Sequence, residues 1–206
     1  TDKKIISEIS NSIKKLENSL IIKEHSSEHT LRVVQYNKRD TKKAKRNSKG
    51  QFEKGSKFEN KTSLRKWIEK LDLYGKDSYT KFIPNQIFTS DNKTVSLFLN
   101  RLFSCDGSIF QKKKHWFVSY CSASKDIINS VQALLLRFNI LSRIKKRTIK
   151  GFESYELYIY GENVTKYCQK IGFYGEKEKR NKKALVDLKK IKHNPNTDTI
   201  PKEIWE

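Results

Sequence analysis

Val95-Ser-Leu-Phe-Leu-Asn-Arg-Leu-Phe-Ser-Cys-Asp-Gly-Ser-Ile109 is the stretch around which the rest of this chain is organised. Apolar residues recur in it at helical spacing and predict a short helix over 95–104 with one apolar face: Val95, Phe98, Leu99, Leu102 and Phe103. Gly107 can adopt a positive φ and end that helix, which leaves the Asp106 carboxylate at the helix C-terminus. The helix dipole disfavours negative charge there unless a cation lies nearby. An ordinary amphipathic core helix followed by an Asp-Gly turn fits the same residues.

Charge is the strongest global property of the chain. Its 206 residues carry a formal net charge of +21, and 35% of them are hydrophobic and 11% aromatic, which favours one large or two small folded domains over wholesale disorder. A field this positive attracts polyanions, and nucleic acid is the expected partner. The sequence has no apolar run long enough to span a membrane and no basic amphipathic helix with a Trp/Leu face. A ribosomal or histone-like structural protein remains an alternative explanation of the charge.

The cysteines and histidines do not predict a zinc site. The three cysteines (Cys105, Cys121 and Cys168) and the four histidines lack zinc-ligand spacing. Because an odd number of scattered cysteines is typical of reducing surroundings, we expect an intracellular compartment such as a bacterial cytoplasm or an organelle. No signal peptide is visible, and the absence of Met suggests a piece of something longer.

The region after Gly107 predicts the fold class. Alternating patterns indicate strands over 108–112, 115–122, 142–150 and 154–160, and helical spacing indicates helices over 126–138 and 163–171. With the helix over 95–104, this order is αββαββα, an α+β architecture with one antiparallel sheet and helices on one face. Asn139 is suited to the left-handed position after its helix. A final basic helix over 175–193 precedes a tail.

Basic residues concentrate in two regions. Between Gln111 and Lys150 there are ten Lys and Arg against one acidic residue, and most lie on the predicted strands and turns: Lys112, Lys113, Lys114, Arg143, Lys145, Lys146, Arg147 and Lys150. Two-stranded ribbons fit the DNA major groove, where such side chains contact bases and phosphates. Residues 37–61 are almost free of apolar side chains and are either a disordered basic linker or an arm that lies along phosphates. The candidate DNA-binding residues of this stretch are Lys42, Lys43, Lys45 and Arg46.

Three segments carry a family resemblance. Leu99-Asn-Arg-Leu-Phe-Ser-Cys-Asp-Gly107 resembles the LAGLIDADG motif of homing endonucleases, in the second-motif form found inside inteins. Lys81-Phe-Ile-Pro84 looks like the lysine-x-isoleucine-proline block that precedes this motif, and residues 131–140 are similar to a later block. Arg101 departs from the pattern, in which a small residue lets two motif helices approach.

The resemblance implies a domain layout and a chemistry. Residues 1–80 would be a partial first repeat with the basic insert 37–61, residues 81–175 the second repeat, and 176–206 a basic helix and tail. The first motif and both splicing blocks are expected to be missing from this piece. Asp106 would act with Lys81, and Asp106 and Gly107 would bind Mg²⁺, for metal-dependent cleavage of double-stranded DNA at a long site. Lys145, Lys146 or Arg147 is a possible third catalytic residue.

Two further expectations follow from the resemblance. Because one acidic helix end is present, the chain could pair with a second copy through helix 95–104, although Arg101 opposes tight pairing. The alternative function is an inactive DNA- or RNA-binding module on the same fold, either maturase-like or a decayed endonuclease.

Overall fold

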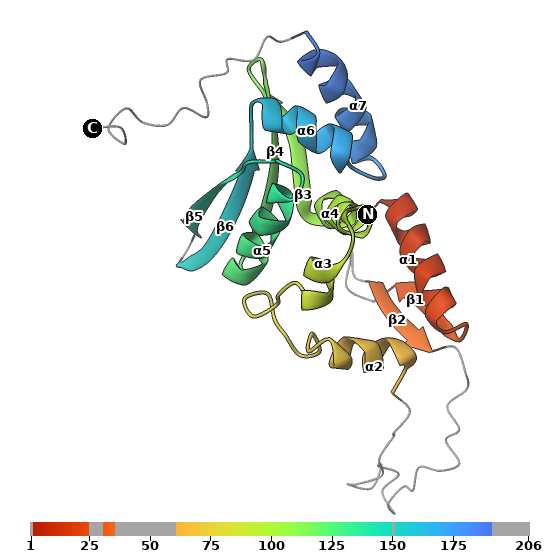
Figure 1. The fold of residues 1–206 in the computed structure, drawn as a ribbon. Helices are drawn as coiled ribbons and strands as arrows, with labels where there is room; N and C mark the ends of the chain where they lie inside the picture. Colours follow the sequence, from red (N-terminus) through yellow and green to blue (C-terminus); the bar gives the residue numbers. More distant parts are fainter. Residues whose placement is uncertain (1, 25–30, 36–60, 150, 191–206) are drawn as a thin grey trace, which may run out of the picture. The chain divides into compact units, whose positions relative to one another are not determined.

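The computed structural model describes residues 2–24, 31–35, 61–149 and 151–190. The chain divides into two compact units, residues 1–76 and 77–206 (Figure 1). The expected basic arm 37–61 lies outside the described residues except for Lys61, as do Lys42, Lys43, Lys45, Arg46 and Lys150. The expected boundaries at 80 and 175 stay predictions.

The described residues of the first unit form two helices and a hairpin. Helix α1 (Lys3–Leu16) precedes the antiparallel strands β1 (Leu20–Glu24) and β2 (Leu31–Gln35), and α2 (Ser63–Lys70) follows. The N-cap of α2 is Thr62, whose hydroxyl accepts the backbone N–H of Arg65 at 3.2 Å.

The second unit has the predicted αββαββα order with two additional helices. Helices α3 (Asn85–Thr89) and α4 (Asn92–Asp106) lead into β3 (Gly107–Lys112) and β4 (His115–Ser122). Helix α5 (Lys125–Leu136) connects this hairpin to β5 (Arg143–Ile149) and β6 (Phe152–Ile159). Helices α6 (Glu162–Lys170) and α7 (Lys177–Leu188) complete the described part of the unit.

One antiparallel sheet with strand order β3-β4-β6-β5 forms the centre of this unit. Its register places Ile109, Val118 and Ile159 in one row and Tyr120, Leu157 and Ile144 in the next, all on one face. These rows pack against α4, α5 and α6 in a single apolar core, so the helices cover one face of the sheet (Figure 1). The α+β fold predicted from the sequence is confirmed.

No helix of the described residues covers the opposite face of the sheet, which we call the helix-free face. By the strand pleat it presents Ser108, Phe110, Lys112, Phe117, Ser119, Cys121, Arg143, Lys145, Arg147, Ser154, Glu156 and Tyr158. Its cations are therefore contributed by both edge strands, β3 and β5.

Helix α4 is longer than its apolar pattern predicts. The Asp91 carboxylate accepts the backbone N–H of Thr94 at 2.6 Å, which starts the helix at Asn92 rather than near Val95. Val95, Leu99 and Phe103 are completely buried and attach α4 to the core. The short α3 was not predicted, since five residues carry too little periodicity.

Helix α7 packs on the core of the second unit. Its Ala184 and Leu188 belong to the same buried cluster as α4, and the indole N–H of Trp116 in β4 donates to the carboxylate of Asp187 at 3.1 Å. The residues expected to form a separate basic helix thus contribute to the fold around α4.

Candidate active site

Asp106 is the last residue of α4, and its side chain is exposed. The next residue, Gly107, begins β3 and pairs with Tyr120. The carboxylate therefore lies where the helix ends and the sheet begins, as the sequence predicts.

Gly107 is required for a reason other than the expected one. Its φ is −84° and ψ 172°, so the positive φ expected from the sequence is wrong. A Cβ atom at this position would lie 2.8 Å from the Phe103 carbonyl oxygen and 2.9 Å from the Phe103 Cα. Since α4 passes directly into β3, the backbone turns too close to Phe103 for any larger residue.

A lysine from α7 supplies the cation that the end of α4 needs. The Lys177 Nζ lies 2.7 Å from the carbonyl oxygens of Ser104 and Gly107, 3.2 Å from that of Cys105 and 3.4 Å from that of Phe103. These carbonyls belong to the last turn of α4 and the start of β3; that of Phe103 also accepts the Gly107 N–H, and the others lie where donors from the helix run out. Helix α4 has no basic residue of its own in its last turn.

Sequence reasoning missed Lys177 because about seventy residues separate it from its acceptors. One local signal was available. Lys177 is the first residue of α7, a position where the helix dipole disfavours positive charge.

Lys81 lies at the same end of the sheet as Asp106. Its backbone carbonyl accepts the Ser124 hydroxyl at 2.6 Å, and Ser124 comes two residues after the end of β4. Because Gly107 pairs with Tyr120 near that end of β4, the two candidate catalytic residues share one end of the sheet.

The cations of β5 divide between the two faces of the sheet. Arg143 pairs with Tyr158, and Arg143, Lys145 and Arg147 alternate along the helix-free face. Lys146 pairs with Tyr155 on the helix-covered side and forms an ion pair of 2.5 Å with Glu153. Lys146 is therefore not grouped with the other three, although the sequence run suggested one set.

Arg147 belongs to a small polar cluster on the helix-free face. Its guanidinium lies 2.5 Å from the Glu156 carboxylate and also donates to the Tyr158 hydroxyl. Partial burial, followed by the neighbouring Glu156, raises the pKa of Tyr158. Among the described strand residues of this face, Glu156 is the one carboxylate, and it neutralises part of the positive charge.

The β3–β4 turn carries cations at the other end of the sheet. Lys112 pairs with His115, so Lys113 and Lys114 form the connection, and Lys113 has a φ of 55°. Left-handed backbone is uncommon for residues other than glycine. All three lysines are exposed, so they are accessible to an anion such as a phosphate.

The donor atoms at the α4 end fit a hard divalent cation in part. In the described ranges no three His, Cys, Asp or Glu residues gather as a metal cluster. Mg²⁺ commonly uses one or two carboxylates and completes its shell with water and substrate phosphate, which the exposed Asp106 allows. The Gly107 carbonyl is less suited than expected, because it already accepts from Lys177 at 2.7 Å.

The outward side of α4 carries an exposed apolar residue, Leu97, and a cationic residue, Arg101, that contacts its neighbours. Leu97 is 54% exposed, and the Arg101 guanidinium lies 4.1 Å from the centroid of the Tyr174 ring while donating to Asn100 Oδ1. Arg101 is thus held against its own unit. Pairing of two copies through α4 stays a prediction.

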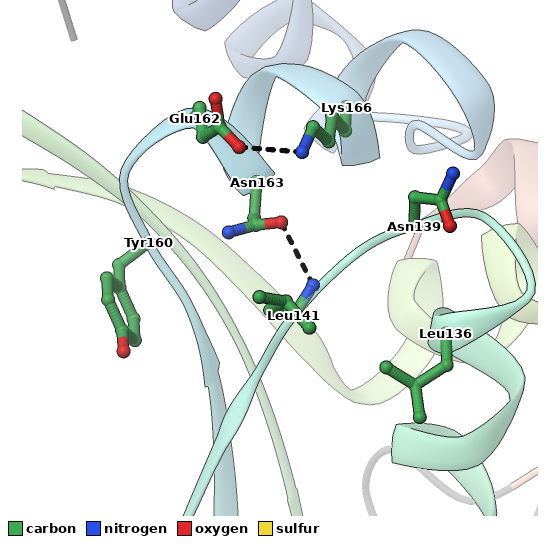
Figure 2. Close-up of a pocket in the computed structure, with 7 residues that line it drawn as sticks. All are labelled: Leu136, Asn139, Leu141, Tyr160, Glu162, Asn163 and Lys166. Atoms are coloured by element: carbon green, nitrogen blue, oxygen red, sulfur yellow. Dashed lines mark hydrogen bonds and ion pairs between the residues drawn. The ribbon is translucent and has the colours of Figure 1, made fainter. Parts of the chain in front are cut away.

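A pocket lies away from these residues, between α5 and α6 (Figure 2). The Asn163 Oδ1 accepts the Leu141 backbone N–H at 2.9 Å, and Glu162 forms a 2.7 Å ion pair with Lys166. The first of these bonds joins α6 to the segment between α5 and β5, and the second lies within α6.

The comparisons with known proteins agree with this geometry. Residues 93–172, from the first turn of α4 to Gly172, match the family model described as a LAGLIDADG-like domain. This segment belongs to the LAGLIDADG family. The domain includes Asp106 and the whole four-stranded sheet, but neither Lys81 nor Lys177. It supports membership of the homing endonucleases.

The chain is also similar to parts of larger proteins. It is 33% identical over 154 residues to a replicative DNA helicase DnaB of Synechocystis sp., covering 71% of this chain and 18% of the helicase. A DnaB of Nostoc sp. is 32% identical over 148 residues, covering 68% of this chain and 17% of the helicase. A replication factor C small subunit of Methanocaldococcus jannaschii is 33% identical over 137 residues, covering 65% of this chain and 7% of the relative. The chain therefore spans less than a fifth of these relatives.

No helix within the described ranges is both long and apolar enough to span a membrane.

Proposed function

We propose that this chain is the endonuclease segment of an intein and cleaves double-stranded DNA at a long, specific site. The observation that carries the proposal is an exposed carboxylate at the end of a LAGLIDADG helix, positioned where that helix enters a sheet with a basic helix-free face. The acid and the cations suit hydrolysis and DNA binding respectively.

The spread of the relatives supports the intein part of the proposal. The similar stretch occurs in a helicase, in a replication factor C subunit and in a DNA-directed RNA polymerase subunit of M. jannaschii. Proteins with such different names share a segment that covers at most 18% of each. A segment inserted into unrelated hosts explains this pattern better than a common working domain.

The length of the sheet matches about half of the long DNA site proposed, which we call a half-site. Strand β4 has eight residues, so the sheet extends about 27 Å along it, equivalent to about eight base pairs of duplex. Cations lie towards both ends of this length, Lys112–Lys114 at one and Arg147 towards the other. A site of about two helical turns therefore needs a second sheet, supplied by another copy or by sequence joined to this chain.

Asp106 and Lys81 have distinct roles in the proposed reaction. Asp106 would hold Mg²⁺, which supplies a polarised water and stabilisation of the leaving oxygen. Lys81 would neutralise charge on the scissile phosphate. The hydrogen bond from the Ser124 hydroxyl to the Lys81 carbonyl holds the backbone from which this side chain extends. Arg143, Lys145 and Arg147 would hold the duplex on the helix-free face.

The test is selection of a random duplex library on the full chain, followed by addition of Mg²⁺ to the enriched pool. We expect an enriched site that is cut only when metal is present. Asp106→Asn should abolish cutting while leaving binding within about threefold, because the carboxylate is exposed and contributes no core packing. A large loss of binding would instead make Asp106 a structural residue.

An inactive binding module is the second candidate. It is favoured by the match to the LAGLIDADG-like model over residues 93–172, which contributes one acidic helix end, Asp106, since cutting both strands needs two. Enrichment of a site without cutting would support this candidate. Failure to enrich any sequence would point to a basic structural protein.

A further inference from the structure

The Lys177 side chain, which belongs to α7, caps the C-terminus of α4. Its ammonium group lies within 3.4 Å of the carbonyl oxygens of Phe103, Ser104, Cys105 and Gly107, which flank Asp106 on both sides. Its three N–H donors are distributed among these acceptors. The backbone that carries the Asp106 side chain is thereby held from a different helix.

The segment that presents Lys177 is itself attached to α4. The Asn100 side chain donates to the Ile171 carbonyl at 2.8 Å, and the Ser104 hydroxyl accepts the Tyr174 backbone N–H at 2.8 Å. Ser104 is buried and also donates to the Asn100 carbonyl at 2.6 Å. These contacts hold the turn between α6 and α7 against α4, and the backbone of Lys177 follows directly after this turn.

The position is unfavourable for a lysine by local rules. Lys177 is the first residue of α7, where the helix dipole favours acidic side chains. A residue that breaks a local preference is expected to have a compensating role elsewhere. That role is found at the C-terminus of α4, whose dipole favours a cation.

We propose that Lys177 is a positioning residue that orients the Asp106 carboxylate by fixing the backbone of residues 103–107. The proposal rests on the proposed function in one respect, since the carboxylate is oriented toward a divalent cation. Its direct consequence, a fixed α4 terminus, does not depend on metal.

Two effects of Lys177 on a bound cation have opposite signs. A fixed carboxylate binds metal better, and removing a group that orients a ligand typically costs 10- to 100-fold in affinity. A lysine that merely competes with the metal for the carbonyl oxygens would weaken binding, so its removal would strengthen it. The direction of the change therefore distinguishes positioning from competition.

The experiment compares four versions of the 206-residue chain: the unaltered sequence, Lys177→Met, Lys179→Met and Asp106→Asn. Lys177→Met keeps an unbranched side chain and removes the charge and donors. Lys179→Met is the matched control, because Lys179 is exposed on the same helix. Amide hydrogen exchange is measured by NMR without metal, and Mn²⁺ is then titrated while broadening of the Gly107 amide signal is followed.

We expect Lys177→Met to accelerate exchange of the Gly107 amide, which donates to the Phe103 carbonyl, by at least about tenfold. Exchange of the paired Val118 and Ile159 amides should stay unchanged, which separates local loosening from global destabilisation. The Mn²⁺ concentration needed for half broadening should rise about tenfold or more. Lys179→Met should match the unaltered chain.

Unchanged Gly107 exchange, or tighter Mn²⁺ binding by Lys177→Met, would overturn the proposal. If Mn²⁺ broadens no signal in the unaltered chain, or broadens it equally in Asp106→Asn, the proposed metal site fails. The exchange measurement then decides the role of Lys177 independently.

Discussion

Three residues at the end of α4 each depart from an ordinary local preference. Asp106 places negative charge at a helix C-terminus, and Lys177 places positive charge at the N-terminus of α7. Gly107 leaves a position without a side chain where the helix meets the strand. The lysine compensates for the acidic end of α4, since its ammonium binds the carbonyls around Asp106. Gly107 allows the close turn in which both are brought together.

Gly107→Ala tests the close approach at the residue scale. We expect the free energy of unfolding to fall by about 2 kcal/mol, because the new methyl would overlap Phe103 backbone atoms that cannot move independently. Urea denaturation measures the change. Ser108→Ala, at the next and exposed position, should change stability by less than about 0.5 kcal/mol. Equal stability of both variants would show that the turn can relax.

Among the secondary-structure elements, α4 and β5 each organise charge. Helix α4 begins at the Asp91 carboxylate and ends at Asp106, so both of its ends carry acids. Strand β5 alternates Arg143, Lys145 and Arg147 on the helix-free face, and Glu156 on β6 binds one of them. The pleat of the strand therefore decides which cations a polyanion can contact.

The cap of α4 predicts a pH dependence. The backbone N–H of Thr94 donates to Asp91 and, with the nearby Lys93 charge, holds the pKa of that carboxyl below its usual 3.8. A depressed folded pKa gives stabilisation that is present above pH 3.8 and is lost as the pH falls through the lower folded value. Asp91→Ala should therefore lower the melting temperature at neutral pH, and the difference should close in acid.

Circular dichroism melts over a range of pH measure this difference. Asp91→Asn keeps an acceptor without the titrating charge and should show a smaller gap that varies little with pH. A gap for Asp91→Ala that stays constant into acid would contradict the assigned cap.

Glu156→Gln tests the charge balance of the helix-free face. Releasing Arg147 from its carboxylate should tighten duplex binding about fivefold, corresponding to about 1 kcal/mol for one exposed charge. Fluorescence anisotropy at fixed salt measures it. Glu153→Gln is the matched control, because its partner Lys146 lies on the other face, and it should change affinity less than Glu156→Gln. Equal effects would mean that only net charge matters.

The whole molecule combines a high positive charge with one short sheet that presents part of it. Under the proposed function, the net charge of +21 would attract duplex from a distance, but six described cations of the sheet and its turn would contact it: Lys112, Lys113, Lys114, Arg143, Lys145 and Arg147. The number of DNA phosphates that the chain contacts should therefore follow these six cations rather than its whole net charge.

The salt dependence of binding tests this division. Six phosphate contacts predict that log K falls with log salt with a slope of about −5 for each copy bound. Anisotropy titrations on a half-site duplex measure the slope, and replacing Lys113 by Gln should reduce its magnitude by about one unit. A slope much steeper than −5 would require contacts from other residues of the chain, and a flat profile would contradict DNA binding.

Much of the second unit could be predicted because its signals are local. The alternation of Trp116, Val118 and Tyr120 predicts β4 and its buried face, and all three are buried. Asn139, expected to tolerate left-handed backbone, has a φ of 56°. The position of Asp106 at a helix end also follows from the sequence, since an apolar helical stripe ends just before it.

The sequence by itself determined the order of helices and strands, the excess of positive charge and the acidic end of α4, because each depends on residues close together in the chain. The tertiary structure alone decided which side chains meet. It brought Lys177 to carbonyls some seventy residues away, turned Lys146 away from Arg147, and made Gly107 necessary through contact with Phe103 rather than through φ. Periodicity indicates which face of an element is buried, but not which residues of two distant elements meet, so such contacts leave no local signal in the sequence.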